Sequence, residues 1–306
     1  MQPAPSTTPR VGYLGPEGTF SEEALLGSVE DAAVAPVALE TIREAVMAVQ
    51  AGEVEWSLVP IENSIEGSVT VTLDALARDA SEVAIVGEVV LPVRHYLIAR
   101  RRLELGQIET IVSHPHVPGQ CTRFLHKQLP RVRVVAATST AEAVRLVAEG
   151  ESDGANEGYG RWAAIGTQLA GELYGCTVIA EGIQDREDNE TRFVWLARTD
   201  SSTGVPPLRS TGAMGHKTSL VLWGPGADRA GWLVLCLDEF ARRAINLTKI
   251  ESRPMRERLG HYMFFLDLEG SLADEAVSEA LVGLRAMCEQ VRVLGSYPAA
   301  RKTPKG

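Results

Sequence analysis

The clearest structural signal in the chain is Val11-Gly12-Tyr13-Leu14-Gly15-Pro16-Glu17-Gly18-Thr19-Phe20-Ser21, where an apolar run passes through a glycine loop into acidic residues. The apolar run predicts a strand. A helix is expected to begin at Thr19 or Ser21, because Glu22 and Glu23 then lie in its first turn and suit the helix dipole. Similar strand and helix units alternate along the following sequence, so we expect an α/β fold with mostly parallel strands.

The alternating units divide into two lobes. The first is expected at about residues 10–92 and 181–198, and the second at about residues 93–180. The strand predicted at Phe193–Ala197 returns to the first lobe, so the chain crosses between the lobes twice. Two lobes joined in this way leave a cleft, which is the usual place for a small ligand.

A linker and a further domain are expected after these lobes. Residues 199–216 are rich in Ser, Thr, Gly and Pro, a composition typical of a linker. Residues 217–296 then follow the order strand, helix, strand, strand, helix, strand, which is the βαββαβ ferredoxin-like topology. The basic tail Arg301–Gly306 has no expected structure.

Composition restricts the possible partners. The chain has 306 residues, 45% of them hydrophobic, which suits two or three domains. Its net charge of -10 argues against sequence-independent nucleic-acid binding, which needs a basic face. An anionic substrate would have to be held by local cationic groups and helix N-termini.

The cysteines and the apolar runs indicate the cell compartment of the protein. Cys121, Cys176, Cys236 and Cys288 form no CxxC pair, so buried, reduced thiols are expected. No secretory signal is visible, and no apolar run approaches the roughly 20 residues of a membrane helix. We therefore expect a cytoplasmic protein without a membrane contact.

The glycine loop is the first candidate binding segment. Gly15 and Gly18 let the backbone approach a ligand, and the N–H groups of Thr19, Phe20 and Ser21 would suit a carboxylate. The alternative is a structural turn before a capped helix. The loop lacks the third spaced glycine of a dinucleotide fingerprint.

A second candidate segment follows the buried strand predicted at Ser57–Ile61. Glu62, Asn63, Ser64, Glu66 and Ser68 supply more hydrogen-bonding groups than a turn requires. One reading is that Asn63 or Ser68 only caps the next helix. The other is that these side chains contact a ligand at the end of the strand, where open α/β sheets bind substrates.

The third candidate is Thr191-Arg192-Phe193 at the start of a strand. Side chains alternate along a strand, so Thr191 and Phe193 are expected on one face and Arg192 on the other, unless the segment is bent. Arg192 could equally be a structural ion-pair partner of Glu62 or Asp188.

The second lobe adds candidates in Ser113-His114-Pro115-His116 and Gln120-Cys121. Ser113 and Gln120 could reach the cleft. His114 and His116 have no third ligand at useful spacing, so no metal site is expected.

Four segments, taken together and in order, resemble the signature set of bacterial prephenate dehydratases. They are Gly15 to Ser21 (GPxGTFS), Val59 to Gly67 (VPIENSxEG), Ser113 to Cys121 (SHPxxxxQC) and Thr191 to Phe193 (TRF). The resemblance implies a two-lobed, periplasmic-binding-protein-like catalytic domain that dehydrates and decarboxylates prephenate to phenylpyruvate without a metal or cofactor.

The resemblance also implies roles for individual residues. Thr191 would be catalytic, and Arg192 would support substrate binding or site geometry. The cleft would be lined by Thr19, Ser21, Glu62, Asn63, Ser64, Ser113, Gln120 and Phe193. The pyruvyl carboxylate is expected at the helix start Thr19–Ser21 or near Arg192.

The C-terminal domain resembles the ACT regulatory domain of the same family. Glu251-Ser252-Arg253-Pro254 matches its ESRP motif, and Asn246 lies just before it. Where Gly-Ala-Leu is usual, this chain has Gly231-Trp232-Leu233, with a large side chain beside the expected phenylalanine pocket. Alternatively, Trp232 packs a dimer interface. The resemblance implies regulation by L-phenylalanine in a homodimer or homotetramer.

Two alternatives remain from the sequence. Arogenate dehydratase acts on the transaminated analogue of prephenate, and a non-catalytic amino-acid sensor could share this domain arrangement. The segment Asn156–Trp162 is an apparent insertion of unassigned role.

Overall fold

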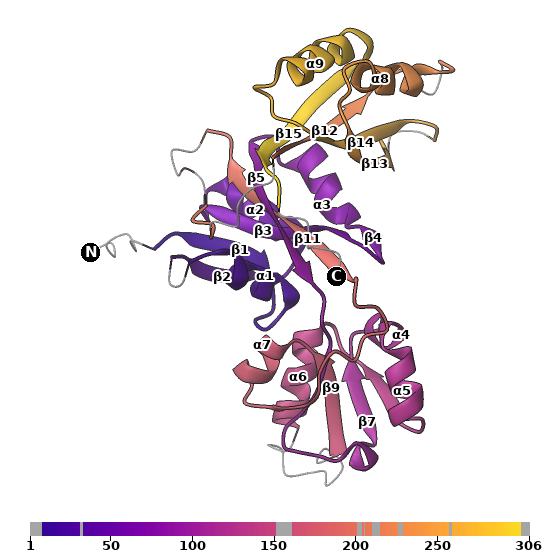
Figure 1. Cartoon of the computed structure of the whole chain (residues 1–306). Coiled ribbons are helices and arrows are strands. Elements are labelled where there is room, and N and C mark those ends of the chain that lie inside the picture. The colour runs from indigo at the N-terminus through magenta and orange to yellow at the C-terminus, as the bar shows by residue number, and fades with distance from the viewer. Residues whose placement is uncertain are drawn as a thin grey trace, which may run out of the picture.

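The computed structural model describes residues 8–30, 33–150, 161–200, 204, 206–209, 215–225, 229–256 and 259–300. Most of the apparent insertion before Trp162 and the basic tail from Arg301 lie outside these ranges. The described chain forms three sheets arranged in a row, with lobe 1 between lobe 2 and the C-terminal domain (Figure 1). Within the described residues no helix is long and apolar enough to cross a membrane.

The sheet of lobe 1 has the strand order β2-β1-β3-β11-β5, with the short β4 paired to β3. Its strands are β1 (Arg10–Leu14), β2 (Ala35–Leu39), β3 (Trp56–Asn63), β4 (Gly67–Ser68), β5 (Val83–Pro92) and β11 (Glu190–Arg198). Its helices are α1 (Phe20–Ser28), α2 (Ile42–Ala51), α3 (Thr70–Asp74) and the π-helical turn η1 (Ala75–Asp79). β1 runs parallel to β2 and β3, whereas β11 runs antiparallel to both of its neighbours because it returns from lobe 2.

Lobe 2 contains a second mixed sheet, in the order β10-β6-β9-β7-β8. Its strands are β6 (Tyr96–Ala99), β7 (Thr110–Ser113), β8 (Arg133–Ala136), β9 (Trp162–Gly166) and β10 (Thr177–Ala180). Its helices are η2 (Leu105–Gln107), α4 (Val117–Gln120), α5 (Thr122–Gln128), α6 (Thr140–Glu149) and α7 (Gln168–Leu173). Helices α4 and α5 are separated at Cys121.

The C-terminal domain has the expected βαββαβ order, with strands arranged β13-β14-β12-β15. Its elements are β12 (His216–Trp223), α8 (Trp232–Ala241), β13 (Leu247–Pro254), β14 (Tyr262–Glu269), α9 (Glu275–Met287) and β15 (Gln290–Pro298). Both helices lie on the outer side of this sheet, and its other face meets lobe 1 (Figure 1). The predicted fold class, two α/β lobes followed by a ferredoxin-like domain, is confirmed. The expectation of mostly parallel strands is wrong, because both lobe sheets are mixed and β11 and β6 run antiparallel to their neighbours.

One hydrophobic core joins the C-terminal sheet to lobe 1. Side chains alternate along β11, and Phe193 and Trp195 pack with α1 on one face of the lobe 1 sheet. Val194 and Leu196 pack on the other face, in a core that also contains Phe265 of β14. β11 therefore has the interior of lobe 1 on one side and the C-terminal domain on the other.

Candidate active site

A hollow of about 530 Å³ lies between the two lobes, at the carboxyl end of β1 and the start of β11. Polar side chains from both lobes meet there. The described residues that line it are Leu14, Gly15, Pro16, Thr19, Phe20, Glu40, Asn63, Glu66, Val93, His95, His114, His116, Val117, Gln120, Thr138, Ser139, Thr140, Asn189 and Thr191. This hollow is the cleft that two chain crossings led us to expect.

Thr191 and Asn63 meet in this cleft. They are paired residues of the β11–β3 ladder, and Asn63 Nδ2 donates to Thr191 Oγ1 over 2.9 Å. Among the described residues, the Thr191 hydroxyl has no hydrogen-bond acceptor, although its oxygen accepts from Asn63. The hydroxyl proton is therefore available to a ligand in the cleft.

The loop after β3 holds Asn63 in this orientation. Its Oδ1 accepts from the backbone N–H groups of Ile65 and Glu66, both over 2.9 Å, so its amide must present Nδ2 to Thr191. Ser64 supports the same geometry, because its hydroxyl accepts from the N–H of Glu190 over 3.0 Å. Asn63 thus orders the turn and also reaches the cleft. Ser64 stabilises the start of β11 through this hydrogen bond and does not line the hollow.

Gln120 connects the two lobes across the cleft. Its Nε2 donates to Glu66 Oε1 over 3.0 Å, and its Oε1 accepts from Asn189 Nδ2 over 3.1 Å. The carboxylate of Glu66 can only accept, which fixes the orientation of the Gln120 amide. His95 Nε2, 3.1 Å from the same Oε1, must therefore carry the proton.

His95 was not anticipated from the sequence. The residue is 1% exposed, its ring meets Phe20 edge-on, and its Nδ1 has no partner among the described residues. Burial lowers the pKa of His95, while the hydrogen bond to Gln120 acts in the opposite direction. A neutral imidazole with an unused acceptor nitrogen is therefore part of the cleft lining.

The cleft contains no Lys or Arg among its described lining residues. Its acidic groups are Glu40 and Glu66, and the pKa of His114 is lowered by burial and by His116. The expectation that local cationic side chains hold an anionic substrate is therefore wrong for the cleft lining. Neutral donors and the starts of α1 and α6 face the hollow instead.

Arg192, Glu62 and Phe193 do not line the cleft. Arg192 points to the opposite face of the sheet, where Nη2 lies 3.1 Å from Glu62 Oε2 and 2.6 Å from Asp267 Oδ2. This agrees with the alternation expected for the strand and with the ion pair to Glu62, but it places both residues against the C-terminal domain. Phe193 is 2% exposed in the core of lobe 1.

Of the other residues predicted to line the cleft, Thr19 does so, whereas Ser21 and Ser113 do not. Thr19 lines the hollow, and its hydroxyl donates to the carbonyl of Leu14 over 3.0 Å. Ser21 is buried behind it, outside the lining. Ser113 is fully buried, has no partner for its hydroxyl among the described residues and does not line the hollow.

The histidine, cysteine and acidic side chains near the cleft do not form a metal site or a reactive thiol within the described residues. Within the described ranges, no group of three His, Cys, Asp or Glu side chains is placed to hold a metal ion. His114 and His116 lie with ring centroids 5.3 Å apart. Burial raises the pKa of the Cys121 thiol to about 12, so this neighbour of Gln120 is not a nucleophile at neutral pH.

The predicted effector segment Gly231-Trp232-Leu233 lines a second hollow of about 260 Å³, together with Tyr262 and Phe264 of β14. Trp232 is 2% exposed, and its Nε1 donates to the carbonyl of Met287 over 2.9 Å. Its side chain packs in the core of the C-terminal domain rather than on an outer interface.

The other predicted effector residues lie along the edge strand β13 and just before it. Glu251 and Arg253 face lobe 1, where they contact Ser68 and Asp74, while Ser252 and Pro254 are exposed. Asn246 accepts a backbone hydrogen bond from Glu269. None of these residues lines the hollow beside Trp232.

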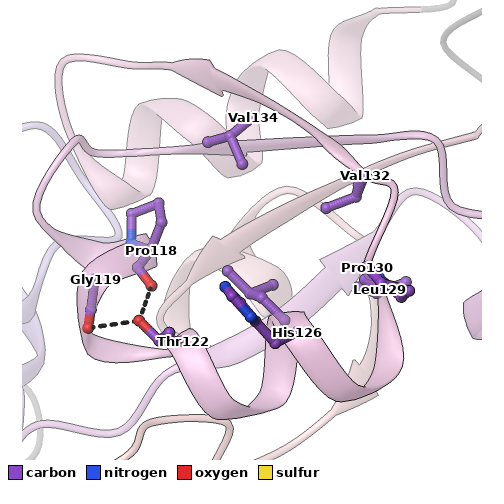
Figure 2. A pocket seen from close by; sticks show the side chains of 9 residues that line it. Pro118, Gly119, Thr122, His126, Leu129, Pro130, Val132 and Val134 are labelled. Atoms are coloured by element: carbon purple, nitrogen blue, oxygen red, sulfur yellow. Dashed lines mark hydrogen bonds between the residues drawn. The ribbon is translucent and has the colours of Figure 1, made fainter.

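A third hollow, of about 380 Å³, lies on lobe 2 between α4, α5 and β8 (Figure 2). Its lining is mainly apolar and includes Leu125, Leu129 and Val134, and its titratable side chain is His126. The Thr122 hydroxyl contacts the carbonyls of Pro118 and Gly119 in the preceding helix α4. This hollow lacks the converging polar groups of the interlobe cleft.

The chain is similar to proteins that are already known. The family model described as prephenate dehydratase matches residues 11–201. A prephenate dehydratase of Mycobacterium sp. (strain JLS) is 41% identical over 300 residues, covering 95% of this chain and 89% of its own.

Two solved structures extend the comparison. The prephenate dehydratase from Arthrobacter aurescens in complex with L-Phe is similar with a TM-score of 0.80 and 38% identity, covering 97% of this chain and 92% of its own. GqqA, described as a novel type of quorum quenching acylase, is similar with a TM-score of 0.80 and 26% identity, covering 96% and 98%.

Proposed function

The chain belongs to the prephenate dehydratase family, and we propose that Thr191 donates the proton with which the interlobe cleft dehydrates and decarboxylates prephenate to phenylpyruvate. The observation that supports this role is the hydrogen bond from Asn63 to Thr191 Oγ1. By accepting from Asn63, the hydroxyl keeps its own proton for the substrate. Asn63 also stabilises the alkoxide character that Thr191 develops as it donates.

The reaction needs one proton. The ring carboxylate leaves as CO2, its electron pair enters the ring, and the ring C–O bond breaks to form an aromatic product. Expelled hydroxide, whose conjugate acid has a pKa of about 15.7, must be protonated to leave as water. A threonine hydroxyl can share its proton late in this step and recover one from solvent, so no metal or cofactor is required.

Substrate orientation is assigned to neutral donors. We expected the pyruvyl carboxylate either at the start of α1 or near Arg192, and Arg192 does not reach the cleft. We therefore assign this carboxylate to the start of α1 at Thr19. The start of α6 at Ser139 is a second site that can donate hydrogen bonds to it. The ring carboxylate should be held weakly, because it must become neutral CO2. Gln120 and Asn189 then contact the ring side of the substrate.

The first experiment is phenylpyruvate formation from prephenate by the purified chain, with Thr191→Val and Thr191→Ser in parallel. Valine keeps the shape of threonine without the hydroxyl, and serine keeps the hydroxyl. We expect Thr191→Val to lose about 100-fold or more in kcat and Thr191→Ser to retain most activity. Equal turnover by both variants would remove Thr191 from the proton-transfer step.

Regulation by L-phenylalanine is proposed for the C-terminal domain. The support is the ESRP match, the hollow beside Trp232 and the relative from Arthrobacter aurescens that was solved with L-Phe. We further propose a homodimer or homotetramer in which C-terminal domains associate. Val234, Leu235 and Ile250 supply exposed apolar side chains for that contact, being 68%, 44% and 50% exposed.

The test of regulation compares Trp232→Phe with the unchanged chain. The substituted phenylalanine side chain lacks the indole N–H, so the Met287 carbonyl loses its hydrogen-bond donor. This loss should lower the free energy of unfolding by about 1 to 3 kcal/mol. Calorimetric titration with L-phenylalanine should show altered affinity if Trp232 borders the effector. Light scattering with and without L-phenylalanine measures the oligomer, and a monomer under both conditions would refute the proposed assembly.

Residues 10–198 are assigned to catalysis, 199–216 to the linker and 217–296 to the ACT domain, in a protein of the cytoplasm. Arogenate serves as the control substrate in every assay. A chain that binds amino acids but turns over neither compound would favour the sensor instead.

A further inference from the structure

Six charged side chains meet where lobe 1 contacts the C-terminal domain. Arg192 is central, because its guanidinium pairs with Asp267 over 2.6 Å and with Glu88 and Glu62 over 3.1 Å. Lys217 pairs with Glu88 over 2.8 Å, and Lys249 pairs with Glu62 over 3.3 Å. We call these six residues the seam network.

The positive and negative charges of the seam network are equal in number only when both domains are present. Lobe 1 supplies one cation and two carboxylates, and the C-terminal domain supplies two cations and one carboxylate. The side chains of Arg192, Glu88 and Asp267 are 10%, 2% and 7% exposed, so water cannot replace a missing partner. Removing one partner of such a group is strongly unfavourable, because it leaves a buried charge uncompensated.

Arg192 is fully ionised in this setting. Burial alone would lower its pKa, but the carboxylates of Asp267, Glu88 and Glu62 raise it above the ordinary value. Asp267 is itself oriented by Ser219, whose hydroxyl donates to Oδ1 over 2.6 Å. The Arg192–Asp267 pair is therefore held in one geometry by partners on both sides.

The seam network and the cleft are built on adjacent residues of the same two strands. Thr191 pairs with Asn63 and Arg192 pairs with Glu62 in the β11–β3 ladder. Consecutive side chains of a strand point to opposite faces, so the first pair faces the cleft and the second faces the C-terminal domain. A shift of Arg192 or Glu62 toward the C-terminal sheet must move the backbone that carries Thr191 or Asn63.

Strand β14 connects this network to the hollow beside Trp232. Phe264 lines that hollow, and Asp267 lies three residues further along the strand, a distance of about 10 Å. β14 is hydrogen-bonded on both edges, to β12 and to β13, so Phe264 and Asp267 belong to one central strand of the sheet.

We propose that Arg192 is a positioning residue for Thr191 and that Asp267 sets its position according to the state of the C-terminal domain. This inference rests on the proposed function, because Thr191 is the proton donor whose position is controlled. An effector in the hollow displaces β14, Asp267 moves Arg192, and the neighbouring Thr191 hydroxyl leaves the geometry set by Asn63. Small displacements of a catalytic group are costly, since about 1 Å can lower a rate by about 100-fold.

Asp267→Asn is the first test, because asparagine keeps the shape and can still accept from Ser219 but loses the charge that holds Arg192. We expect kcat for prephenate to fall about tenfold or more while KM stays within about twofold. L-phenylalanine should still bind by calorimetry but should no longer change kcat. If Asp267 had a merely structural role, its substitution would not abolish the effect of L-phenylalanine on kcat while leaving the binding of L-phenylalanine intact.

Asp74→Asn is the matched control. Asp74 also joins lobe 1 to the C-terminal domain, by an ion pair to Arg253 over 2.8 Å, but it lies on α3 rather than on β3 or β11. Its basal kcat should equal that of the unchanged chain. Loss of kcat in both variants to the same degree would overturn the proposal, because any weakened contact between the domains would then suffice.

Arg192→Lys provides a second variant if Asp267→Asn does not fold. Lysine keeps the charge but cannot form the forked contact with Asp267 and Glu88 together, so kcat should fall with KM retained. Unchanged kcat and unchanged response to L-phenylalanine in either folded variant would refute the inference.

A readout that needs no turnover separates this inference from the proposed function. Hydrogen exchange of the peptide containing residues 190–198 should change when L-phenylalanine is added to the unchanged chain, and not in Asp267→Asn. If the unchanged chain does not convert prephenate, the proposed function fails, whereas the exchange measurement still decides whether Asp267 controls β11. Exchange that responds equally in both proteins would refute that control.

Discussion

The side chains of Asn63 and Thr191 meet across the β3–β11 ladder, where Asn63 Nδ2 lies 2.9 Å from Thr191 Oγ1. The two residues are 128 positions apart in the chain. They come from strands of opposite direction, and each strand carries a neighbour, Glu62 or Arg192, that faces the C-terminal domain. The proposed catalytic pair and the contact to the C-terminal domain are thus parts of one ladder.

Asn63→Asp tests the donor role of the amide. Aspartate retains an oxygen for the N–H groups of Ile65 and Glu66, so the turn should persist. Its carboxylate cannot donate to Thr191 and would instead accept the hydroxyl proton that the substrate needs. We expect kcat to fall about 100-fold, in the range found for removing one donor from a developing oxyanion. Initial rates of phenylpyruvate formation measure this, with Ile65→Ala in the same loop as control. A kcat within about twofold of the unchanged chain would contradict the role.

The positions of most elements followed from hydrophobic periodicity, because each strand or helix buries one regular set of side chains. The strand β2 was missed. It is an edge strand of five residues, and its apolar residues are interrupted by Pro36, which argues against a strand in a pattern read from sequence. The antiparallel direction of β11 depends on the second chain crossing, which no local pattern encodes.

The candidate site was predicted less completely than the fold. The alternation along β11 correctly placed Arg192 opposite Thr191, and yet the partner Asp267 depends on how the third sheet packs on lobe 1. His95 carries no signal in the sequence, since a lone histidine before an apolar strand resembles an ordinary core residue. Its role is visible only through its contact with Gln120.

Gln120 and Glu66 offer a reciprocal test of lobe closure. Gln120→Glu places two carboxylates where a hydrogen bond of 3.0 Å now joins the lobes, and we expect KM for prephenate to rise about tenfold or more. Combining it with Glu66→Gln restores one donor and one acceptor, and the new carboxylate can still accept from His95 and Asn189. Steady-state kinetics should therefore show KM recovered in the double variant. A KM in the double variant as high as in Gln120→Glu would show that the bond does not govern closure.

His95 should make stability dependent on pH. The pKa of His95 is lowered in the folded chain. Below a pH of about 6.5, His95 is therefore protonated in the unfolded chain while it stays neutral in the folded chain. The free energy of unfolding then decreases as the pH falls, with a limiting slope of about 1.4 kcal/mol per pH unit for this one proton. Denaturant titrations between pH 7.5 and 5.5 should show a smaller slope for His95→Gln. His126→Gln, an exposed residue on α5, is the control, and equal slopes for His95→Gln and the unchanged chain would contradict the assignment.

Gly295 fixes how closely the C-terminal sheet approaches lobe 1. A Cβ at this position would collide with the backbone carbonyl of Ile85 on β5, and a backbone atom cannot move aside as a flexible side chain can. Gly295→Ala should therefore push β15 away from β5, at a cost of about 1 to 3 kcal/mol in stability.

The same displacement should lower kcat, because β5 carries Glu88 and β15 lies beside β12, which carries its partner Lys217. Thermal unfolding and prephenate kinetics on one preparation measure both effects. Gly27→Ala is the matched control: its added methyl group meets open space within a helix, where alanine is favoured by about 0.5 to 1 kcal/mol over glycine. The two substitutions should thus shift the melting temperature in opposite directions, with only Gly295→Ala reducing kcat. A Gly295→Ala protein with lowered stability and full kcat would show that Thr191 tolerates a looser contact with the C-terminal domain.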